Sequence, residues 1–321
     1  MKIVVLDGYA ANPGDIGWDE LFTLGDVTVY DRTPPELVVE RIGDAEIALV
    51  NKIFLSDEIM RQCKNLKYLG IMATGYNIID TRAASAYGIT VCNVPAYSTP
   101  SVVQHTFALL LELCIRTGEH AESVKNGKWS ACPDFCYWER PLVELSGKTM
   151  GLIGFGQIGK GVAKVATSFG MDVLACAARK RDSSGMDGVR LTDIEELLSS
   201  SDVISLHCPL TGDNKNLICK KTIDRMRDGS LVINTARGGL VNETDVADAL
   251  LSGKLGGYAA DVLTDEPPAN GSPLIGMPNC YITPHIAWAP LECRRRLITE
   301  VVKNVRCFID GHPQNVVNKT K

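Results

Sequence analysis

Several side chains that could move a proton or hold an anion each follow a short, strand-like apolar run. His285 and Arg237 come directly after two such runs, and Asp261, with Glu266 a little further on, follows a third. Catalytic groups of open α/β folds gather at the carboxyl ends of parallel strands. An imidazole changes its charge near neutral pH, and a guanidinium offers a planar fork to an anion. Their placement makes these residues candidates, although periodicity alone does not bring them together.

The other four histidines suit structural or solvent-exposed positions. His105 lies within a helical pattern, and His207 follows a strand that looks buried. His120 and His312 lie in polar stretches where we expect exposure. We interpret His207 as a histidine whose hydrogen bonds are satisfied inside the fold, which leaves His285 as the candidate acid–base group.

Gly154, Gly156 and Gly159 form the pattern G-x-G-x-x-G between an apolar strand pattern and an amphipathic helix pattern. In a dinucleotide site the first glycine permits a tight turn, the second lets the backbone approach the pyrophosphate, and the third lets the helix pack on the strand. The helix N-terminus then offers free N–H groups to the phosphates. A plain strand-to-helix turn is the alternative, and the flanking elements favour the dinucleotide site.

The next predicted strand, residues 173–176, bears on which dinucleotide binds. An NAD site has an acid at the end of this strand to hold the ribose hydroxyls, but Ala177 stands there and three cations follow, among them Arg179. Without the acid a 2′-phosphate is not repelled, and Arg179 could pair with it through two hydrogen bonds. We therefore favour NADP slightly, while NAD binding beside a solvated basic loop has nearly equal weight.

Strand and helix patterns alternate, which predicts two parallel-sheet α/β halves joined through a long helix. In the first half we expect strands at 3–6, 27–30, 47–50, 66–71 and 90–94, helices at 35–42, 57–63 and 81–87 with caps Thr33, Ser56 and Asp80, and the long helix at 101–116. In the second half we expect strands at 149–153, 173–176, 203–207, 231–234, 258–261 and 281–283, and helices at 158–169, 193–198, 220–226, 243–251 and 290–309. Residues 126–141, rich in aromatic side chains, are the least regular segment.

Composition excludes several classes of protein. Among 321 residues, 33 lysines and arginines against 38 acids give a net charge of −5, so there is no bulk attraction for nucleic acid or an anionic membrane, although a local basic patch stays possible. No run approaches the ~18 apolar residues of a membrane span, and the first apolar run is too short for a signal peptide. Eleven scattered cysteines predict reduced thiols in a cytoplasmic protein rather than disulfides or a zinc site. No metal site is expected, because no cluster has ligand spacing.

The ordered motifs resemble those of the D-isomer-specific 2-hydroxyacid dehydrogenases over nearly the full length of the chain. The matched stretches are ATGYNIID at 73–80, GFGQIG at 154–159, HCPLT at 207–211, NTARGG at 234–239, DVLTDEP at 261–267 and PHI at 284–286. So many matches in order are far more specific than any one of them.

The resemblance implies a role for each candidate side chain. His285 would protonate the substrate's carbonyl oxygen during reduction, and Glu266 would hydrogen-bond His285 and fix its tautomer. Arg237 would hold the substrate carboxylate and polarise the carbonyl. Backbone N–H groups around Thr74 and Gly75 would complete the carboxylate site. Glu266 as a plain loop charge is a minor alternative.

The cofactor set implied by the resemblance extends the glycine motif. Asp261 would bind the nicotinamide carboxamide, although a strand-end cap is a minor alternative for it, and Gln157 and Ile158 would face the pyrophosphate. The full set is Thr74, Gly154, Gly156, Gln157, Ile158, Gly159, Ala177, Arg179, Cys208, Thr235, Ala236, Arg237, Asp261, His285 and Ala287. Such a site takes NAD(P)(H), which supplies the hydride.

The resemblance also implies two doubly wound domains, Rossmann-like and flavodoxin-like, with the active cleft between them. A nucleotide domain of residues 98–287 would be inserted into a substrate domain of 1–97 plus 288–321. Family members are usually homodimers, with the helix near 101–117 and the following segment at the interface. Exposed aromatics at 129–138 suit that contact. Trp138 would reach the partner, or else pack within its own chain.

Within the family the chain looks most similar to glycerate dehydrogenases and hydroxypyruvate reductases, which act on small 2-oxo acids. Asn51 and Lys52 occupy the place where the phosphoglycerate branch carries an arginine for its substrate, and the long C-terminal extension of that branch is lacking. We therefore expect hydroxypyruvate or glyoxylate, with D-lactate, bulkier 2-oxo acids or 3-phosphoglycerate as alternatives. A non-catalytic corepressor-like NAD(H) sensor is the other class, but Arg237, Glu266 and His285 are all present.

Overall fold

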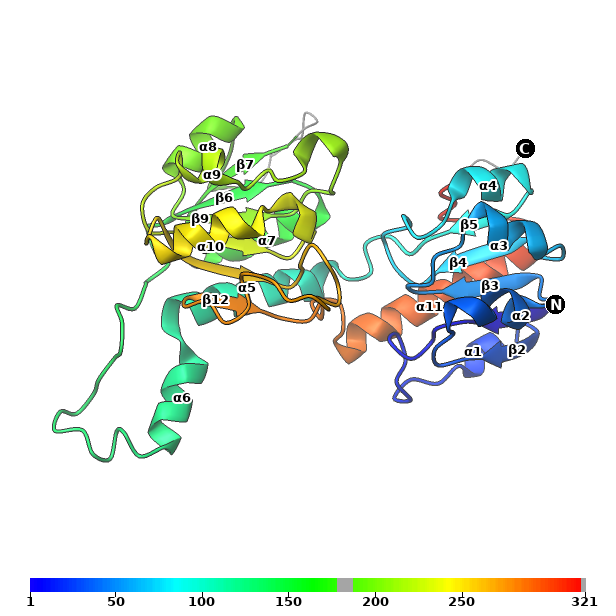
Figure 1. Ribbon diagram of the computed structural model, residues 1–321, viewed down its shortest axis with the longest axis horizontal. Helices are drawn as coiled ribbons and strands as arrows, with labels where there is room; N and C mark the ends of the chain where they lie inside the picture. Colours follow the sequence, from blue (N-terminus) through cyan, green and yellow to red (C-terminus); the bar gives the residue numbers. More distant parts are fainter. Residues whose placement is uncertain (178–186, 319–321) are drawn as a thin grey trace. The chain divides into compact units, whose positions relative to one another are not determined.

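The structure is a computed structural model, and it describes residues 1–177 and 187–318. The chain forms two compact units, each built around its own sheet (Figure 1). Unit 1 consists of Met1–Ser98 and Trp288–Lys321, and unit 2 is Thr99–Ala287. Unit 2 is therefore continuous in sequence, whereas unit 1 combines both ends of the chain.

The described part of unit 1 is centred on a five-stranded parallel sheet in the order β2-β1-β3-β4-β5. Its strands are β1 (Lys2–Val5), β2 (Asp26–Val29), β3 (Ile47–Val50), β4 (Tyr68–Ile71) and β5 (Thr90–Cys92). Its helices are α1 (Asp19–Phe22), α2 (Val38–Ile42), α3 (Asp57–Gln62), α4 (Thr81–Ala86) and α11 (Leu291–Ile309). The strand order reverses between β1 and β3, and open α/β sheets bind ligands at the carboxyl ends of such a pair.

Side chains that alternate along the strands place two apolar cores on opposite faces of this sheet. Val4 packs with the helices α2 to α4, while Ile3 and Val5 pack on the other face with α1 and α11. The predicted caps of α3 and α4 are confirmed, since the Ser56 hydroxyl and the Asp80 carboxylate accept backbone N–H groups of the first turn.

The predicted cap at Thr33 is wrong. The Thr33 hydroxyl donates to the carbonyl oxygen of Leu6 instead. Pro34 precedes a 3-10 turn at Pro35–Leu37, and α2 follows that turn. The sequence-based helix at 35–42 is thus two short elements, because the proline preset the backbone for a tighter first turn.

In the residues that the structure describes, unit 2 has a seven-stranded parallel sheet in the order β12-β11-β10-β9-β6-β7-β8. Its strands are β6 (Thr149–Ile153), β7 (Asp172–Cys176), β8 (Val189–Leu191), β9 (Val203–Leu206), β10 (Ser230–Asn234), β11 (Leu255–Ala260) and β12 (Cys280–Ile282). Its helices are α5 (Thr99–Ile115), α6 (Thr117–Lys125), α7 (Gln157–Ser168), α8 (Ile194–Ser200), α9 (Lys220–Ile223) and α10 (Glu243–Leu251). The order reverses between β6 and β9, which is the switch point of this doubly wound fold.

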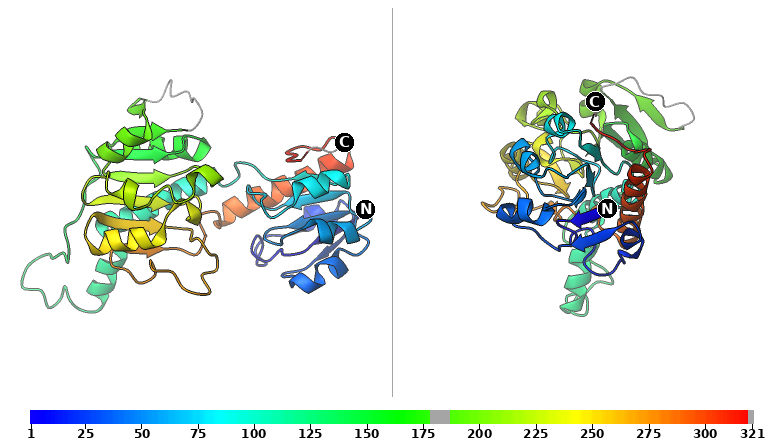
Figure 2. Two further views of the ribbon diagram at one scale, coloured as in Figure 1. Left: turned by 45° about the horizontal axis from the view of Figure 1, so that its top comes forward. Right: turned by 90° about the vertical axis from the view of Figure 1, so that its right-hand side faces the viewer.

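Helices cover both faces of this second sheet (Figure 2). Helices α5 and α7 pack on one core, and α8 to α10 pack on the other. Helix α6 and the loop after it extend away from the sheet in every view (Figures 1 and 2). We call α6 together with residues 126–141 the arm.

One strand and two α-helices of the described residues were not predicted. Strand β8 and helix α1 are short and mostly exposed, so they carry little apolar periodicity. Helix α6 has no buried residue, so it too carries little apolar periodicity. Within the described residues, no helix combines the length and the apolar character needed to cross a membrane.

Candidate active site

The glycine motif turns the chain from β6 into α7 at the switch point of unit 2. Gly154 has φ +106°, and a Cβ there would lie 2.5 Å from the carbonyl carbon of His207. A Cβ at Gly159 would lie 2.2 Å from the carbonyl oxygen of Gly154. At Gly156, by contrast, a Cβ would meet nothing within 4 Å. Two glycines are therefore required by packing, whereas Gly156 opens space before the α7 N-terminus, where Gln157 and a part-exposed Ile158 begin the helix.

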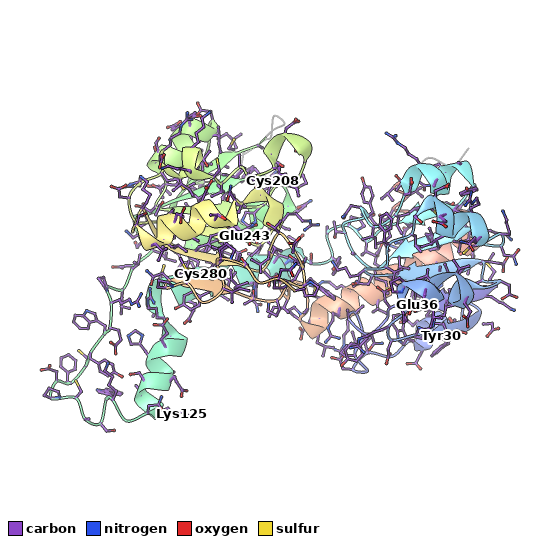
Figure 3. The ribbon with its side chains drawn as sticks, in the orientation of Figure 1. Tyr30, Glu36, Lys125, Cys208, Glu243 and Cys280 are labelled. Atoms are coloured by element: carbon purple, nitrogen blue, oxygen red, sulfur yellow. The ribbon has the colours of Figure 1, made fainter. Side chains whose placement is uncertain are left out.

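The neighbouring strand β9 ends in the segment that packs against this turn. The Ser205 hydroxyl lies 2.9 Å from His207 Nε2, and burial lowers the pKa of His207 to about 4. His207 is therefore a neutral, hydrogen-bonded structural histidine, as its sequence position suggested. Cys208, labelled in Figure 3, comes next at the carboxyl end of β9. Burial raises the pKa of its thiol, so Cys208 is uncharged at neutral pH.

Ala177 follows β7, the strand beside β6 in the sheet. Ala177 is partly exposed and packs against the core that α5 and α7 cover. No acid therefore stands at this strand end, as the sequence shows. Arg179, the cation proposed to pair with a 2′-phosphate, lies outside the described residues.

The loop that carries Arg237 is shaped by the last residue of β10. The buried Asn234 side chain accepts the Ala236 N–H at 3.0 Å and donates to the Arg237 carbonyl oxygen at 2.9 Å. These two bonds close a compact turn around Thr235 and Ala236, which are both partly exposed. The Arg237 side chain is exposed and donates to the Ala236 carbonyl oxygen at 2.6 Å. The guanidinium therefore faces solvent from a fixed backbone.

Gly238 brings the Arg237 loop against the loop that carries Glu266. A Cβ at Gly238 would lie 1.9 Å from the carbonyl carbon of Leu263, so no larger residue fits. The Glu243 carboxylate on α10 (Figure 3) accepts the Thr264 N–H at 2.7 Å, and it also accepts the Ser272 hydroxyl. The loop that carries Glu266 is therefore also held by Glu243 on α10.

Glu266 and His285 form the central polar pair of unit 2. Glu266 Oε2 lies 2.5 Å from His285 Nδ1, and Glu266 Oε1 accepts the Leu263 N–H at 3.0 Å. About a third of each side chain is exposed. His285 has φ +55°, a left-handed backbone that is rare for a residue with a side chain. The carboxylate fixes Nδ1 of the ring, which leaves Nε2 as the nitrogen for a reacting partner.

Asp261 is 1% exposed and bonds residues on both sides of His285 in the chain. Its Oδ1 accepts the Thr283 hydroxyl at 2.6 Å and the Ile286 N–H at 2.8 Å, while its Oδ2 accepts the Ala287 N–H at 2.7 Å. Burial alone would raise the pKa of Asp261, but the hydrogen bonds from His105, Thr283 and these two N–H groups together lower it. Asp261 is therefore a charged, buried anchor for the segment around His285.

The switch point of unit 1 holds Asn51, one of the other candidate residues. The Asp7 carboxylate, after β1, accepts the Asn51 N–H at 2.7 Å and the Lys52 N–H at 2.6 Å, after β3. Burial raises the pKa of Asp7 against the opposing effect of these N–H groups. The Asn51 side chain donates to the Met72 carbonyl oxygen at 2.7 Å, and its own amide oxygen is buried with no hydrogen-bond partner among the described residues.

Thr74 and Gly75 follow β4 in the same unit. The Thr74 hydroxyl donates to the Val94 carbonyl oxygen at 2.8 Å, and Asn93 donates to the Thr74 carbonyl oxygen at 2.7 Å. These bonds fix the backbone of the loop, and the Gly75 backbone is partly exposed.

The structure brings some of the predicted residues into direct contact. In unit 2, Glu266 bonds His285, and the Arg237 loop packs on the Glu266 loop. Sequence reasoning missed the contribution of His105, which lies 2.9 Å from the Thr283 hydroxyl. Its position inside an apolar helical pattern was the available signal, since a polar residue there needs a partner. Among the described residues, no group of three His, Cys, Asp or Glu could hold a metal ion.

Comparison with known proteins decides the family. The model of the D-isomer specific 2-hydroxyacid dehydrogenase NAD-binding domain matches residues 107–287, which is more than half of the chain. The chain belongs to the D-isomer-specific 2-hydroxyacid dehydrogenase family. This dehydrogenase therefore binds a nicotinamide dinucleotide, and the open space at Gly156 before the α7 N-terminus fits the pyrophosphate of that cofactor.

Individual relatives cover almost the whole dehydrogenase. It is 48% identical to a hydroxypyruvate reductase of Blautia hydrogenotrophica over 99% of this chain and 100% of the relative. It is 42% identical to a glycerate dehydrogenase of Methylorubrum extorquens over 90% of each chain. The fold matches D-lactate dehydrogenase of Aquifex aeolicus in complex with NAD and lactic acid, with a TM-score of 0.84 and 29% identity over 100% of both chains. It also matches an acyclic imino acid reductase in complex with NADPH and D-Arg, with a TM-score of 0.86 and 31% identity over 99% of this chain and 100% of the other.

Proposed function

We propose that this dehydrogenase reduces a small 2-oxo acid, hydroxypyruvate or glyoxylate, to D-glycerate or glycolate with NAD(P)H. The observation that carries the proposal is the pair of Glu266 and His285, held beside the Arg237 loop in the unit that also carries the glycine motif. The names of the relatives, hydroxypyruvate reductase and glycerate dehydrogenase, favour these substrates among the 2-oxo acids.

In the proposed mechanism each side chain has one task. The cofactor supplies a hydride to the 2-carbon of the substrate. His285 donates a proton from Nε2 to the substrate's carbonyl oxygen, while Glu266 holds Nδ1 and balances the imidazolium charge. Arg237, exposed at the end of a fixed loop, binds the substrate carboxylate through its fork and polarises the carbonyl.

We assign the remaining substrate contacts to Asn51, Thr74 and Gly75 in unit 1. The fixed loop after β4 has a backbone suited to bind a carboxylate through its N–H groups. Asn51 and Lys52 do not offer the fork of an arginine to a phosphate, which argues against 3-phosphoglycerate.

We further propose that Gln157 and Ile158 face the pyrophosphate, that Cys208, Thr235, Ala236 and Ala287 line the cofactor, and that NADPH is slightly preferred over NADH. The absence of an acid at Ala177 supports this preference. Asp261 is assigned to the nicotinamide carboxamide side, in addition to its bonds within the chain.

A homodimer is the proposed assembly, and the arm is the proposed contact. Phe135 is 89% exposed, Trp138 62% and Trp129 52%. Aromatic side chains exposed together in this way mark protein contacts. None of the eleven cysteines, all of which lie among the described residues, forms a disulfide, which supports a reducing compartment such as the cytoplasm.

The deciding experiment measures initial rates of NADPH and NADH oxidation with hydroxypyruvate, glyoxylate, pyruvate and 2-oxoisocaproate. We expect the highest kcat/KM with hydroxypyruvate or glyoxylate. Turnover of only the bulkier acids would keep the reaction and overturn the substrate. Dinucleotide binding without any turnover would favour a sensor of the corepressor type.

A further inference from the structure

Helix α5 contacts the segment that carries His285 at two points. The Ser101 hydroxyl donates to the Ala287 carbonyl oxygen at 2.5 Å. One turn further along the helix, His105 Nε2 lies 2.9 Å from the Thr283 hydroxyl. Residues four apart share a face of a helix, so both contacts come from one side of α5. They bracket His285, which lies between Thr283 and Ala287.

The hydrogen bonds around Thr283 have a definite direction. The Thr283 hydroxyl has one proton, and the buried charged carboxylate of Asp261, 2.6 Å away, is its strongest acceptor. The hydroxyl oxygen must then accept from His105, so His105 Nε2 carries a hydrogen. The result is a directed chain from the His105 N–H through Thr283 to Asp261. His105 Nε2 is also 3.4 Å from Asp261 Oδ1.

Asp261 also holds the backbone that follows His285. Its two oxygens accept the N–H groups of Ile286 and Ala287. His285 itself has φ +55°, and a residue with a side chain keeps such a backbone only where its surroundings over-determine it. Thr283 before it and Ile286 after it are therefore the points that keep it in place.

We propose that His105 is a positioning residue for proton transfer, acting through Thr283 and Asp261 to fix the direction of the His285 imidazole. The inference rests on the proposed role of His285. Loss of the His105 N–H removes one of the two hydrogen bonds that hold the Thr283 hydroxyl, so the Thr283 side chain is held by Asp261 alone. The turn then relaxes toward an ordinary backbone conformation, and His285 Nε2 moves away from the position that proton transfer requires.

The test compares His105→Leu with His105→Gln. His105→Leu removes the donor, and we expect kcat to fall about 10- to 100-fold, as for a small misplacement of a reacting group. The His105→Gln side chain can donate from a similar point, and we expect it to recover most of the rate. Dinucleotide affinity, measured by fluorescence titration, is expected to fall less than kcat in both variants, because the glycine motif is untouched and only the end of the proposed cofactor site near Asp261 is affected. Gln104→Leu, at an exposed neighbouring position on α5, is the matched control and keeps the wild-type kcat.

The pH profile separates positioning from a purely structural role. A positioning role changes the pH dependence of kcat/KM in His105→Leu and restores it in His105→Gln. A structural role lowers the melting temperature and yield, but leaves kcat per active site and the pH profile of the folded fraction unchanged, and that result would overturn the proposal. If His105→Leu does not fold, Thr283→Val against Thr283→Ser tests the same link, and an unchanged kcat in folded Thr283→Val also overturns it.

A parallel His285→Ala variant keeps the two proposals apart. If His285→Ala retains the wild-type rate, the proposed function fails. If His285→Ala is inactive while His105→Leu matches the wild type in kcat and pH profile, the present inference alone fails.

Discussion

The His285 imidazole is bound through Nδ1 to Glu266, whose other oxygen is held by the Leu263 N–H. The Glu266 carboxylate is therefore held in place by the backbone, and it in turn holds the His285 ring. Because Nδ1 donates to Glu266, the tautomer and the direction of Nε2 are set together. This double constraint makes the pair suited to deliver a proton to one position only.

Removal of the proposed proton donor, His285, should abolish most turnover. His285→Ala is expected to lower kcat for 2-oxo acid reduction by about 10²- to 10⁴-fold, the usual contribution of a positioned proton donor. Glu266→Gln keeps a hydrogen-bond partner but removes the charge that balances the imidazolium, so its loss should be smaller. Steady-state kinetics with parallel dinucleotide titration measure both. Equal rates for His285→Ala and the wild type would contradict the assigned mechanism.

The open space at Gly156 predicts a selective loss of cofactor affinity. Gly156→Ala meets no protein atom within 4 Å, so the melting temperature should hardly change. The added methyl group would occupy the space assigned to the pyrophosphate, and the KM for NAD(P)H should rise at least about tenfold. Gly212→Ala, which also meets nothing within 4 Å, is the control and should leave KM unchanged. A normal KM in Gly156→Ala would place the dinucleotide elsewhere.

Cofactor preference should respond to a single charge at Ala177. Ala177→Asp supplies the acid that holds ribose hydroxyls and repels a 2′-phosphate, so the ratio of kcat/KM for NADH over NADPH should rise by about tenfold or more. Ala177→Asn has nearly the same shape without the charge and serves as the control. Initial rates with each cofactor give the ratio. No change in Ala177→Asp would mean that this strand end does not contact the ribose.

The sequence was informative where local pattern and packing agree. The motif around Gly154 required two of its glycines for close backbone contacts that any residue with a Cβ would prevent, so the pattern itself encodes the geometry. Strand β6 and helix α10 have the predicted bounds, because buried parallel strands and capped amphipathic helices leave clear periodicities. The structure also places Glu266 beside His285, a contact that was expected from family resemblance rather than from spacing.

The features of the site and fold that the sequence did not reveal depend mostly on contacts between residues far apart in the chain. His105 and Thr283 are 178 positions apart, and nothing in either local pattern indicates that they meet. The clearance at Gly238 is set by the distant Leu263 backbone, which the loop sequence alone does not reveal. Short exposed elements such as β8 were missed because they bury too little apolar surface to show a period.

The exposed aromatic side chains of the arm predict an oligomer that can be weakened without unfolding the protomer. Phe135→Ser should shift the dimer toward monomer, since Phe135 is 89% exposed in the single chain and contributes little to its stability. Phe22→Ser, at a phenylalanine that is 52% exposed in unit 1, is the control. Sedimentation velocity over a range of protein concentrations measures the equilibrium. A wild-type protein that is monomeric throughout would contradict the proposed assembly.

His207 predicts a loss of stability in mild acid. Its pKa is lowered to about 4 by burial, whereas the unfolded chain has the ordinary value of about 6.5. Between these values the unfolded state binds more protons than the folded state, so stability is complete above about pH 6.5 and declines as the pH falls toward 4. At pH 5 the loss attributable to this residue is about 2 kcal/mol.

A His207→Gln variant isolates this contribution to the free energy of unfolding. The amide keeps a hydrogen-bonding nitrogen near Ser205 but does not titrate, so the variant should lose less stability between pH 7 and 5 than the wild type, by about 2 kcal/mol. Urea unfolding at the two pH values, followed by circular dichroism, gives the difference. Other titrating groups are common to both proteins and cancel in the comparison. Parallel losses in the two proteins would show that His207 takes up its proton without cost in the folded state, and that its burial does not exclude the charge.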